Sequence, residues 1–124
     1  MSVVSICIDV ADVKQATQFY TQVLECTIKQ EKSDSTELQV ENSTVYLIQK
    51  EENSNPLVKG TASRIYQRHW TPVHLDFHVD NIEQAITLVT EFGGEVEEQQ
   101  SGDWGSAAFC ADPFGNGFCL IKIN

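Results

Sequence analysis

An internal repeat constrains the fold of this chain more than any other feature. The segment SICIDVADVKQAT, residues 5–17, resembles the segment HLDFHVDNIEQAIT, residues 74–87. The identical pairs are Val10/Val79, Gln15/Gln84 and Ala16/Ala85. Because a duplicated segment usually folds in the same way twice, the repeat predicts two copies of one structural module.

Each copy begins with the pattern of a strand and continues with that of a helix. Apolar residues alternate at Val4, Ile6, Ile8 and Val10, and again at Val73, Leu75, Phe77 and Val79. This period of two is typical of a half-buried strand. Asp12 and Asn81 follow as expected helix N-caps, each with a glutamine three residues later. The expected buried stripes are Val13, Ala16, Phe19, Tyr20, Val23 and Leu24 in the first helix, and Ile82, Ala85, Ile86, Val89 and Phe92 in the second.

Short strand-like runs follow both helices, so each module has the pattern βαβββ. The runs are approximately 27–31, 37–40 and 45–50, then 96–99, 107–111 and 118–123. We therefore expect an α+β fold and one domain over residues 1–124. Module one covers about 1–50, a crossover about 51–71 and module two about 72–124. A crossover of this length is expected to carry functional contacts or a short helix.

Charge and composition exclude several functional classes. Eight Lys and Arg residues against 18 Asp and Glu give a net charge of −10, which disfavours nucleic acid and anionic membranes as partners. No apolar run approaches the roughly 20 residues that cross a bilayer, and the N-terminus lacks the pattern of a signal peptide. We therefore expect a cytoplasmic protein.

The cysteines favour neither a zinc finger nor a disulfide framework. Cys7, Cys26, Cys110 and Cys119 form no CxxC pair. Reduced thiols that pack as small apolar side chains are the expectation. The sequence leaves open whether Cys110 lies near Cys119 across the last hairpin.

Three motifs in this order resemble a known superfamily. They are DVKQATQFYTQVL, TPVHLDFHVDNIEQAI and ADPFGNGFCLI. Together they resemble the vicinal oxygen chelate superfamily, which includes glyoxalase I, bleomycin-resistance proteins, fosfomycin-modifying enzymes and extradiol dioxygenases. The resemblance implies an open, U-shaped mixed-sheet cleft with the helices on the outer face. It also implies a homodimer whose sites draw on both chains.

The resemblance also locates the positions at which metal-dependent members carry their ligands. In this chain these positions are Ser5, Tyr46, His74 and Cys119. Of these, His74 alone is a good ligand for a hard divalent ion. We therefore expect no cofactor and no tightly bound metal, with a divalent metal held through His74 as the alternative.

The second repeat offers the strongest catalytic candidates. His74, Asp76 and His78 share the polar face of the strand 73–80, about 6.5–7 Å apart in sequence order. His74 as a general base and Asp76 as its orienting partner would form a tentative catalytic pair. The alternative is that this face meets bulk water and that Asp80 helps to cap the following helix.

A larger set of residues is expected to line a ligand site. These residues are Ser5, Cys7, Tyr46, Trp70, His78, Trp104 and Cys119. Simple packing is the alternative for Cys7, Trp104 and Phe118. Arg64, Tyr66, Arg68 and His69 form, with Trp70, a basic and aromatic cluster. It would suit an anionic ligand or pair with acidic neighbours, and the sequence does not separate the two.

Two functional hypotheses follow, and they leave open whether the protein is an enzyme. The first is a glyoxalase/bleomycin-resistance-like protein that binds a small organic molecule, such as an antibiotic, without a tightly bound metal. The second is a metal-dependent lyase, isomerase or dioxygenase of glyoxalase I type.

Overall fold

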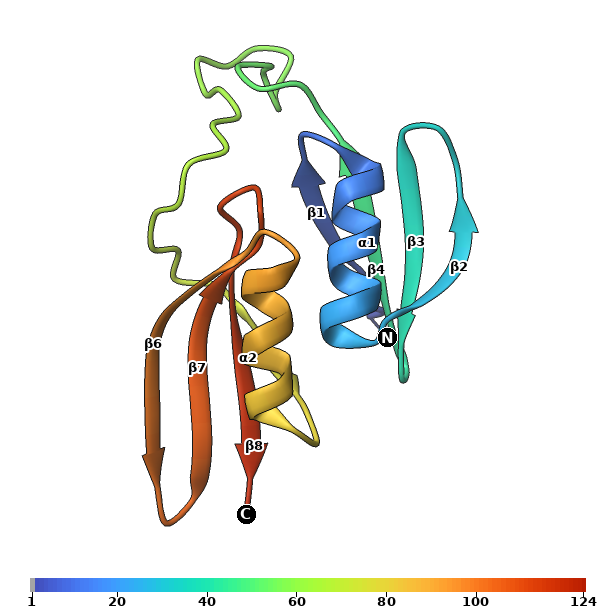
Figure 1. Ribbon diagram of the computed structural model, residues 1–124. Helices are drawn as coiled ribbons and strands as arrows, with labels where there is room; N and C mark the ends of the chain where they lie inside the picture. The colour runs from blue at the N-terminus through green and yellow to red at the C-terminus, as the bar shows by residue number, and fades with distance from the viewer. Residues whose placement is uncertain (1) are drawn as a thin grey trace.

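The computed structural model describes residues 2–124, which form two βαβββ modules (Figure 1). The first module consists of β1 (Ile6–Val10), α1 (Val13–Leu24), β2 (Thr27–Glu31), β3 (Ser35–Val40) and β4 (Ser43–Gln49). The second consists of β5 (Leu75–His78), α2 (Ile82–Glu91), β6 (Glu95–Gly102), β7 (Gly105–Ala111) and β8 (Gly117–Ile123). The predicted α+β class and the predicted order of elements are confirmed.

Each module has its own mixed sheet of four strands. The strand orders are β1-β4-β3-β2 and β5-β8-β7-β6. β1 pairs with β4, and β5 with β8, in parallel, whereas the other pairs are antiparallel. Within residues 2–124, β1 and β5 therefore have one paired edge each, and no strand of one sheet pairs with the other sheet. The helices pack on one face of the sheets and leave the other face open (Figure 1).

The helices begin where the sequence predicts. The side chains of Asp12 and Asn81 each accept a hydrogen bond of 3.0 Å, from the backbone N–H of Gln15 and Gln84. These bonds satisfy donors that a helix N-terminus leaves free. The whole expected stripe of α1 is buried, whereas in α2 only Ala85 and Val89 are fully buried.

The core joins the two modules. α1 and α2 lie side by side (Figure 1), and apolar residues from both modules form one cluster. Phe118 of β8 packs edge-on against Phe19 of α1 and against Phe77 of β5, with both ring centroids 5.9 Å away. Phe118 is therefore a core residue, which is the packing alternative that the sequence had left open.

The starts of β1 and β5 differ from the prediction. Val4 and Val73 are 79% and 84% exposed, because the strands begin only at Ile6 and Leu75. Pairing with β4 and β8 starts at those residues, so the preceding valines lie outside the paired part of each strand. The crossover from residue 51 to residue 74 contains no helix.

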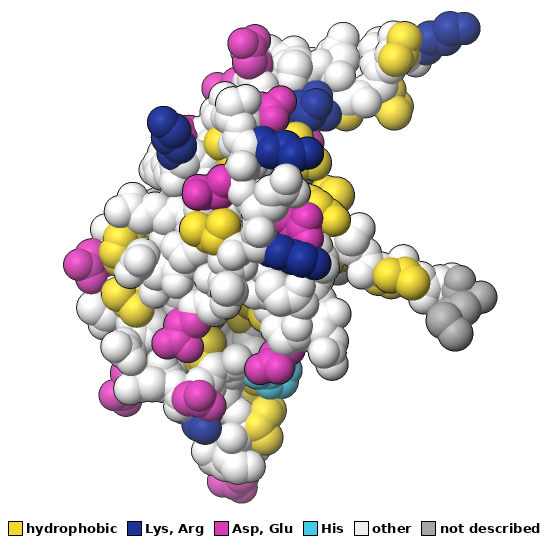
Figure 2. Space-filling view, turned by 90° about the vertical axis from the view of Figure 1, so that its right-hand side faces the viewer, with side chains coloured by type: hydrophobic (Ala, Val, Ile, Leu, Met, Phe, Trp, Pro, Cys, Tyr) yellow, Lys and Arg dark blue, Asp and Glu magenta, His cyan; other side chains and the backbone are white. Residues whose placement is uncertain are grey.

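Acidic side chains are scattered over the face that Figure 2 presents and do not gather into one patch. The net charge of the whole chain is −10. On the face shown, the scattered distribution favours a role for the acidic side chains in keeping the surface solvated. None of the helices among residues 2–124 is long and apolar enough to cross a membrane.

The turn between β7 and β8 connects several elements. The carboxylate of Asp112 is buried and accepts hydrogen bonds from the backbone N–H of Phe114 and of Asn116, at 2.8 and 2.9 Å. It also accepts a bond of 2.7 Å from the hydroxyl of Tyr20 in the middle of α1. This bond attaches the first helix to the second sheet.

We expect Tyr20→Phe to lower the free energy of unfolding by about 1–3 kcal/mol, because a buried carboxylate oxygen loses a donor. Urea denaturation followed by circular dichroism measures this change. Tyr66→Phe is the matched control, since its hydroxyl donates to a backbone oxygen at an exposed position. Equal losses in the two variants would contradict a special role for the Tyr20–Asp112 bond.

Candidate functional site

Three polar side chains meet on the open face of the second sheet. His74 Nδ1 lies 3.1 Å from Asp76 Oδ1 and 3.8 Å from Cys119 Sγ. One possible ligand atom from each of the three residues lies within 4.8 Å of the others. The predicted His74–Asp76 contact is confirmed, and Cys119 joins it. His78 follows on the same strand face and is exposed.

Strand alternation and register bring this cluster together. Phe77 of β5 packs against the core on the helix side, and by strand alternation Leu75 shares its face, so His74 and Asp76 take the other face. Asp76 and Cys119 are direct partners in the parallel β5–β8 pair. Cys110 pairs with Phe118, the neighbour of Cys119, and so lies on the helix side of the sheet.

The crossover brings Arg68, a member of the basic and aromatic cluster, against the second module. The guanidinium of Arg68 forms a two-point ion pair with Glu97 of β6, at 2.8 and 3.0 Å. It lies against the backbone of Gly117, where a Cβ atom would come within 2.6 Å of it. The backbone of Gln67 and Arg68 lies equally close to Gly115, at 2.9 and 2.8 Å from the position of a Cβ.

The aromatic part of this site is Trp70. Its ring centroid is 5.6 Å from that of His74, and the side chain is 60% exposed. A half-open indole beside polar groups offers a flat surface on which a small molecule can stack.

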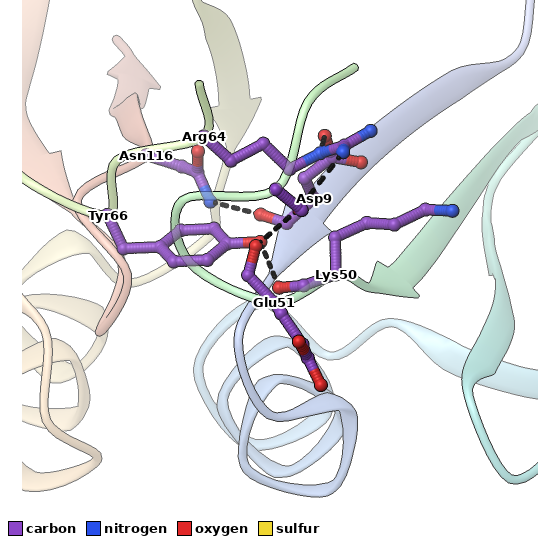
Figure 3. Close-up of polar contacts among 7 residues, drawn as sticks. Asp9, Lys50, Glu51, Arg64, Tyr66 and Asn116 are labelled. Atoms are coloured by element: carbon purple, nitrogen blue, oxygen red, sulfur yellow. Dashed lines mark hydrogen bonds and ion pairs between the residues drawn. The ribbon is translucent and has the colours of Figure 1, made fainter. Parts of the chain in front are cut away.

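The remaining arginine of the basic and aromatic cluster binds to the first module. Arg64 Nε donates to Asp9 Oδ2 at 2.8 Å, and Asn116 Nδ2 donates to the backbone oxygen of Asp9 at 3.1 Å. The hydroxyl of Tyr66 donates to the backbone oxygen of Lys50 at 2.6 Å. Figure 3 shows these side chains meeting at the end of β1. Since Arg64 and Arg68 both have carboxylate partners, the cluster pairs with acidic neighbours.

Other predicted ligand residues lie apart from this cluster. Cys7 and Tyr46 are partners in the β1–β4 pair of the first sheet, and Ser5 directly precedes β1. Trp104 is in the turn between β6 and β7 and is 47% exposed, so it is not a core residue. Its backbone oxygen accepts a hydrogen bond from the backbone N–H of Asn124. Asn124 follows the C-terminal end of β8, whereas Cys119 lies near the beginning of that strand.

Burial keeps three of the four thiols protonated. Burial raises the pKa of Cys26 and of Cys119 to about 11 and that of Cys110 to about 12. The negative charge of Asp76 adds to the effect at Cys119. All four cysteines are free, and Cys7 is exposed, contrary to the expectation that it packs as a buried residue.

The cluster occupies an open sheet surface. Two hollows in the protein surface lie elsewhere, each between a helix and the hairpin of its own module. Val13, Thr17 and Thr36 are among the residues of the first, and Ile82 and Gln99 among those of the second. Neither hollow contains a residue of the His74 cluster. The candidate site is therefore identified by the grouping of His74, Asp76 and Cys119 and not by the shape of the surface.

A family model described as a glyoxalase-like domain matches residues 5–121. The chain belongs to this family. The predicted resemblance to the vicinal oxygen chelate superfamily is thereby confirmed. No curated protein matches the sequence.

Solved structures share this fold over nearly their whole length. The fosfomycin resistance protein FosX from Listeria monocytogenes superposes with a TM-score of 0.74 at 12% identity, covering 100% of this chain and 94% of its own. A glyoxalase/bleomycin resistance protein from Albidiferax ferrireducens T118 gives 0.70 at 17% identity, with 97% of both chains covered. A hypothetical protein from S. aureus gives 0.69 at 22% identity, covering 98% of this chain and 97% of its own. At these identities the likeness shows the fold alone.

The glyoxalase-like fold raises the question of a metal. A FosX variant from L. monocytogenes was solved with Mn(II) and a dihydroxypropylphosphonic acid. Mn(II) is a hard ion that prefers oxygen ligands in six-coordinate sites. Here the cluster supplies one carboxylate, one imidazole and one buried thiol, and Ser5 and Tyr46 belong to the first module. This donor set does not fit a hard ion.

We expect alkylation of the native protein at pH 8 to modify Cys7 alone. Cys7 is exposed, whereas the other thiols are buried and have a pKa of about 11 or 12. Intact-mass spectrometry after brief treatment with iodoacetamide should show one adduct, and Cys7→Ser should show none. Labelling of Cys119 as fast as that of Cys7 would contradict the assignment.

Replacing the two turn glycines should have unequal effects. At Gly115 a methyl group meets the backbone of Gln67 and Arg68, and φ is +82°, so we expect Gly115→Ala to cost about 1–3 kcal/mol of unfolding free energy. At Gly117 it meets only the end of the flexible Arg68 side chain, so the cost should be smaller. Urea denaturation of both variants tests this order, and the reverse order would contradict it.

Proposed function

We propose that this glyoxalase-like protein binds a small organic molecule on the open face of its second sheet, without a tightly held metal. The observation that carries the proposal is the cluster of His74, Asp76 and Cys119 beside the exposed ring of Trp70. Imidazole, carboxylate and thiol groups offer donors and acceptors, and the indole offers a flat apolar surface. We place the protein in the cytoplasm.

The chemistry of the face favours a ligand with polar groups and a planar or apolar part. Arg68 already has Glu97 as its partner, so the face carries no free arginine for an anion. The similar structures include a fosfomycin resistance protein and a glyoxalase/bleomycin resistance protein. An antibiotic is therefore among the ligands we propose.

The proposal includes a homodimer. One chain supplies a floor for the ligand but no enclosing wall, and ligand sites usually surround most of the ligand. The unpaired edges of β1 and β5 and the exposed Val4 and Val73 beside them offer surface for a second copy. The open face of the first sheet, with Ser5, Cys7 and Tyr46, would then contribute to the enclosed site.

A second candidate is an enzyme of glyoxalase I type: a lyase, isomerase or dioxygenase. The proximity of three possible ligand atoms, within 4.8 Å of one another, favours a form that uses a metal. In a metal-free form, His74 would take a proton from a carbonyl substrate and Asp76, 3.1 Å from Nδ1, would orient the ring.

The chain contains two tryptophans, so single replacements locate the ligand. We expect library compounds that bind to change the fluorescence of Trp104→Phe, which retains Trp70, and to leave that of Trp70→Phe unchanged. Stacking on the indole explains the expected change. Fluorescence titration is the measurement, and an equal response in both variants would place the ligand away from the His74 cluster.

The variant His74→Ala separates the two candidates. A binding protein should lose about tenfold in affinity, the usual value of one hydrogen bond, and form no product with or without the replacement. An enzyme should convert the bound compound and lose that turnover completely in His74→Ala.

A further inference from the structure

We infer that Asn116 is a deamidation site, and that its conversion to a carboxylate weakens the contact between the two modules. The inference goes beyond the proposed function, because it concerns a covalent change in the chain itself and requires no ligand. It rests on the residue that follows Asn116 and on the two oxygen atoms that its side-chain amide contacts.

The residue that follows Asn116 favours reaction at this asparagine over the others. Asn116 is the one asparagine in the sequence that precedes a glycine. Asn42 and Asn53 precede serines, Asn81 precedes an isoleucine, and Asn55 precedes a proline, which has no N–H. Because glycine has no Cβ, its backbone nitrogen can approach the preceding side chain more closely than that of any other residue.

The reaction balances with water as the co-reactant. The backbone nitrogen of Gly117 loses its proton to hydroxide and attacks Cγ of Asn116. A bond forms between these two atoms, the bond from Cγ to Nδ2 breaks, and Nδ2 takes up a proton and leaves as ammonia. Water then opens the resulting five-membered imide at either carbonyl, to give aspartate or isoaspartate. Both residues are half-buried, so water reaches them.

In the folded chain, hydrogen bonds hold the amide of Asn116 away from this reaction. Its Nδ2 donates to the backbone oxygen of Asp9 at 3.1 Å (Figure 3) and to Oδ2 of Asp112 at 2.9 Å. Rotation of the side chain toward the nitrogen of Gly117 breaks both bonds. The reaction therefore proceeds from a locally opened form of the turn, and its rate reports how often the turn opens.

Deamidation replaces a donor at the junction of the modules by an acceptor. The new carboxylate at position 116 faces the backbone oxygen of Asp9 and the carboxylate of Asp112, to which the amide had donated. Two carboxylates that share a buried site repel each other, and Asp112 is 4% exposed. Since Tyr20 of α1 also donates to Asp112, the change affects both contacts of the turn with the first module. Refolding does not restore the amide, so the weakening is permanent.

Incubation of the full chain at pH 8, followed by peptide mapping, measures the modification. We expect aspartate and isoaspartate to accumulate at position 116 in the folded chain, at least about tenfold more slowly than in urea, because the reaction requires local opening. Gly117→Ala is the matched control, since it retains Asn116 and its methyl group meets the flexible end of Arg68. This variant should lose most of the modification. Modification confined to the chain in urea, or an unchanged rate in Gly117→Ala, would overturn the inference.

The variant Asn116→Asp reproduces one product and tests its effect on the junction. Its urea midpoint, followed by circular dichroism, should lie below that of Asn116→Ala, which loses the same two hydrogen bonds without gaining a charge. Failure of Asn116→Asp to fold where Asn116→Ala folds agrees with the inference, whereas an equal or higher midpoint contradicts it. Neither variant changes the His74 cluster, so this inference and the proposed ligand site fail separately.

Discussion

The buried carboxylate of Asp112 is the group on which the arrangement of the second module depends most. Burial raises its pKa, and hydrogen bonds from Tyr20, Phe114 and Asn116 oppose that rise. With Asn116 Nδ2 at 2.9 Å from Oδ2, these donors form one network that fixes the turn between β7 and β8. The same Asn116 amide reaches the backbone of Asp9, so the network links the turn to α1 and to β1. A turn held in this way can serve as a fixed support for the crossover.

The crossover in turn determines what lies over the second sheet. Its backbone at Gln67 and Arg68 lies on Gly115, and the Arg68 side chain lies on Gly117. From there the chain continues past Trp70 to His74, and both rings come to lie beside each other at the start of β5. The absence of a side chain at two positions of the turn therefore has a consequence for the site. It lets an irregular segment approach the sheet closely and place an aromatic ring beside the polar cluster.

The sequence predicted the features that depend on local spacing. Alternation located the strands, the N-caps at Asp12 and Asn81 located the helices, and strand periodicity placed His74 beside Asp76. It did not reveal that Arg68 pairs with Glu97, because that contact joins residues far apart in the chain through a segment without periodicity. The glycines of the turn carried a signal for close approach, but the sequence does not show what approaches. The exposure of Val4 and Val73 was also missed, since the alternating pattern extends to them whereas the strands begin only at Ile6 and Leu75.

These exposed strand starts and the open polar face have the same physical origin. In each module, a helix covers one face of the sheet and β4 or β8 occupies one edge of the first strand, which leaves the other face and edge to whatever binds there. Polar residues on an open face remain solvated and cost little, whereas exposed valines at an edge favour burial by another surface. A fold of this kind separates stability from recognition. The helix side holds the modules together through Phe19, Phe77 and Phe118, so residues on the open side can change their chemistry without loss of the core. A thiol at position 119, on the side of the sheet away from the helices, is compatible with the fold for this reason.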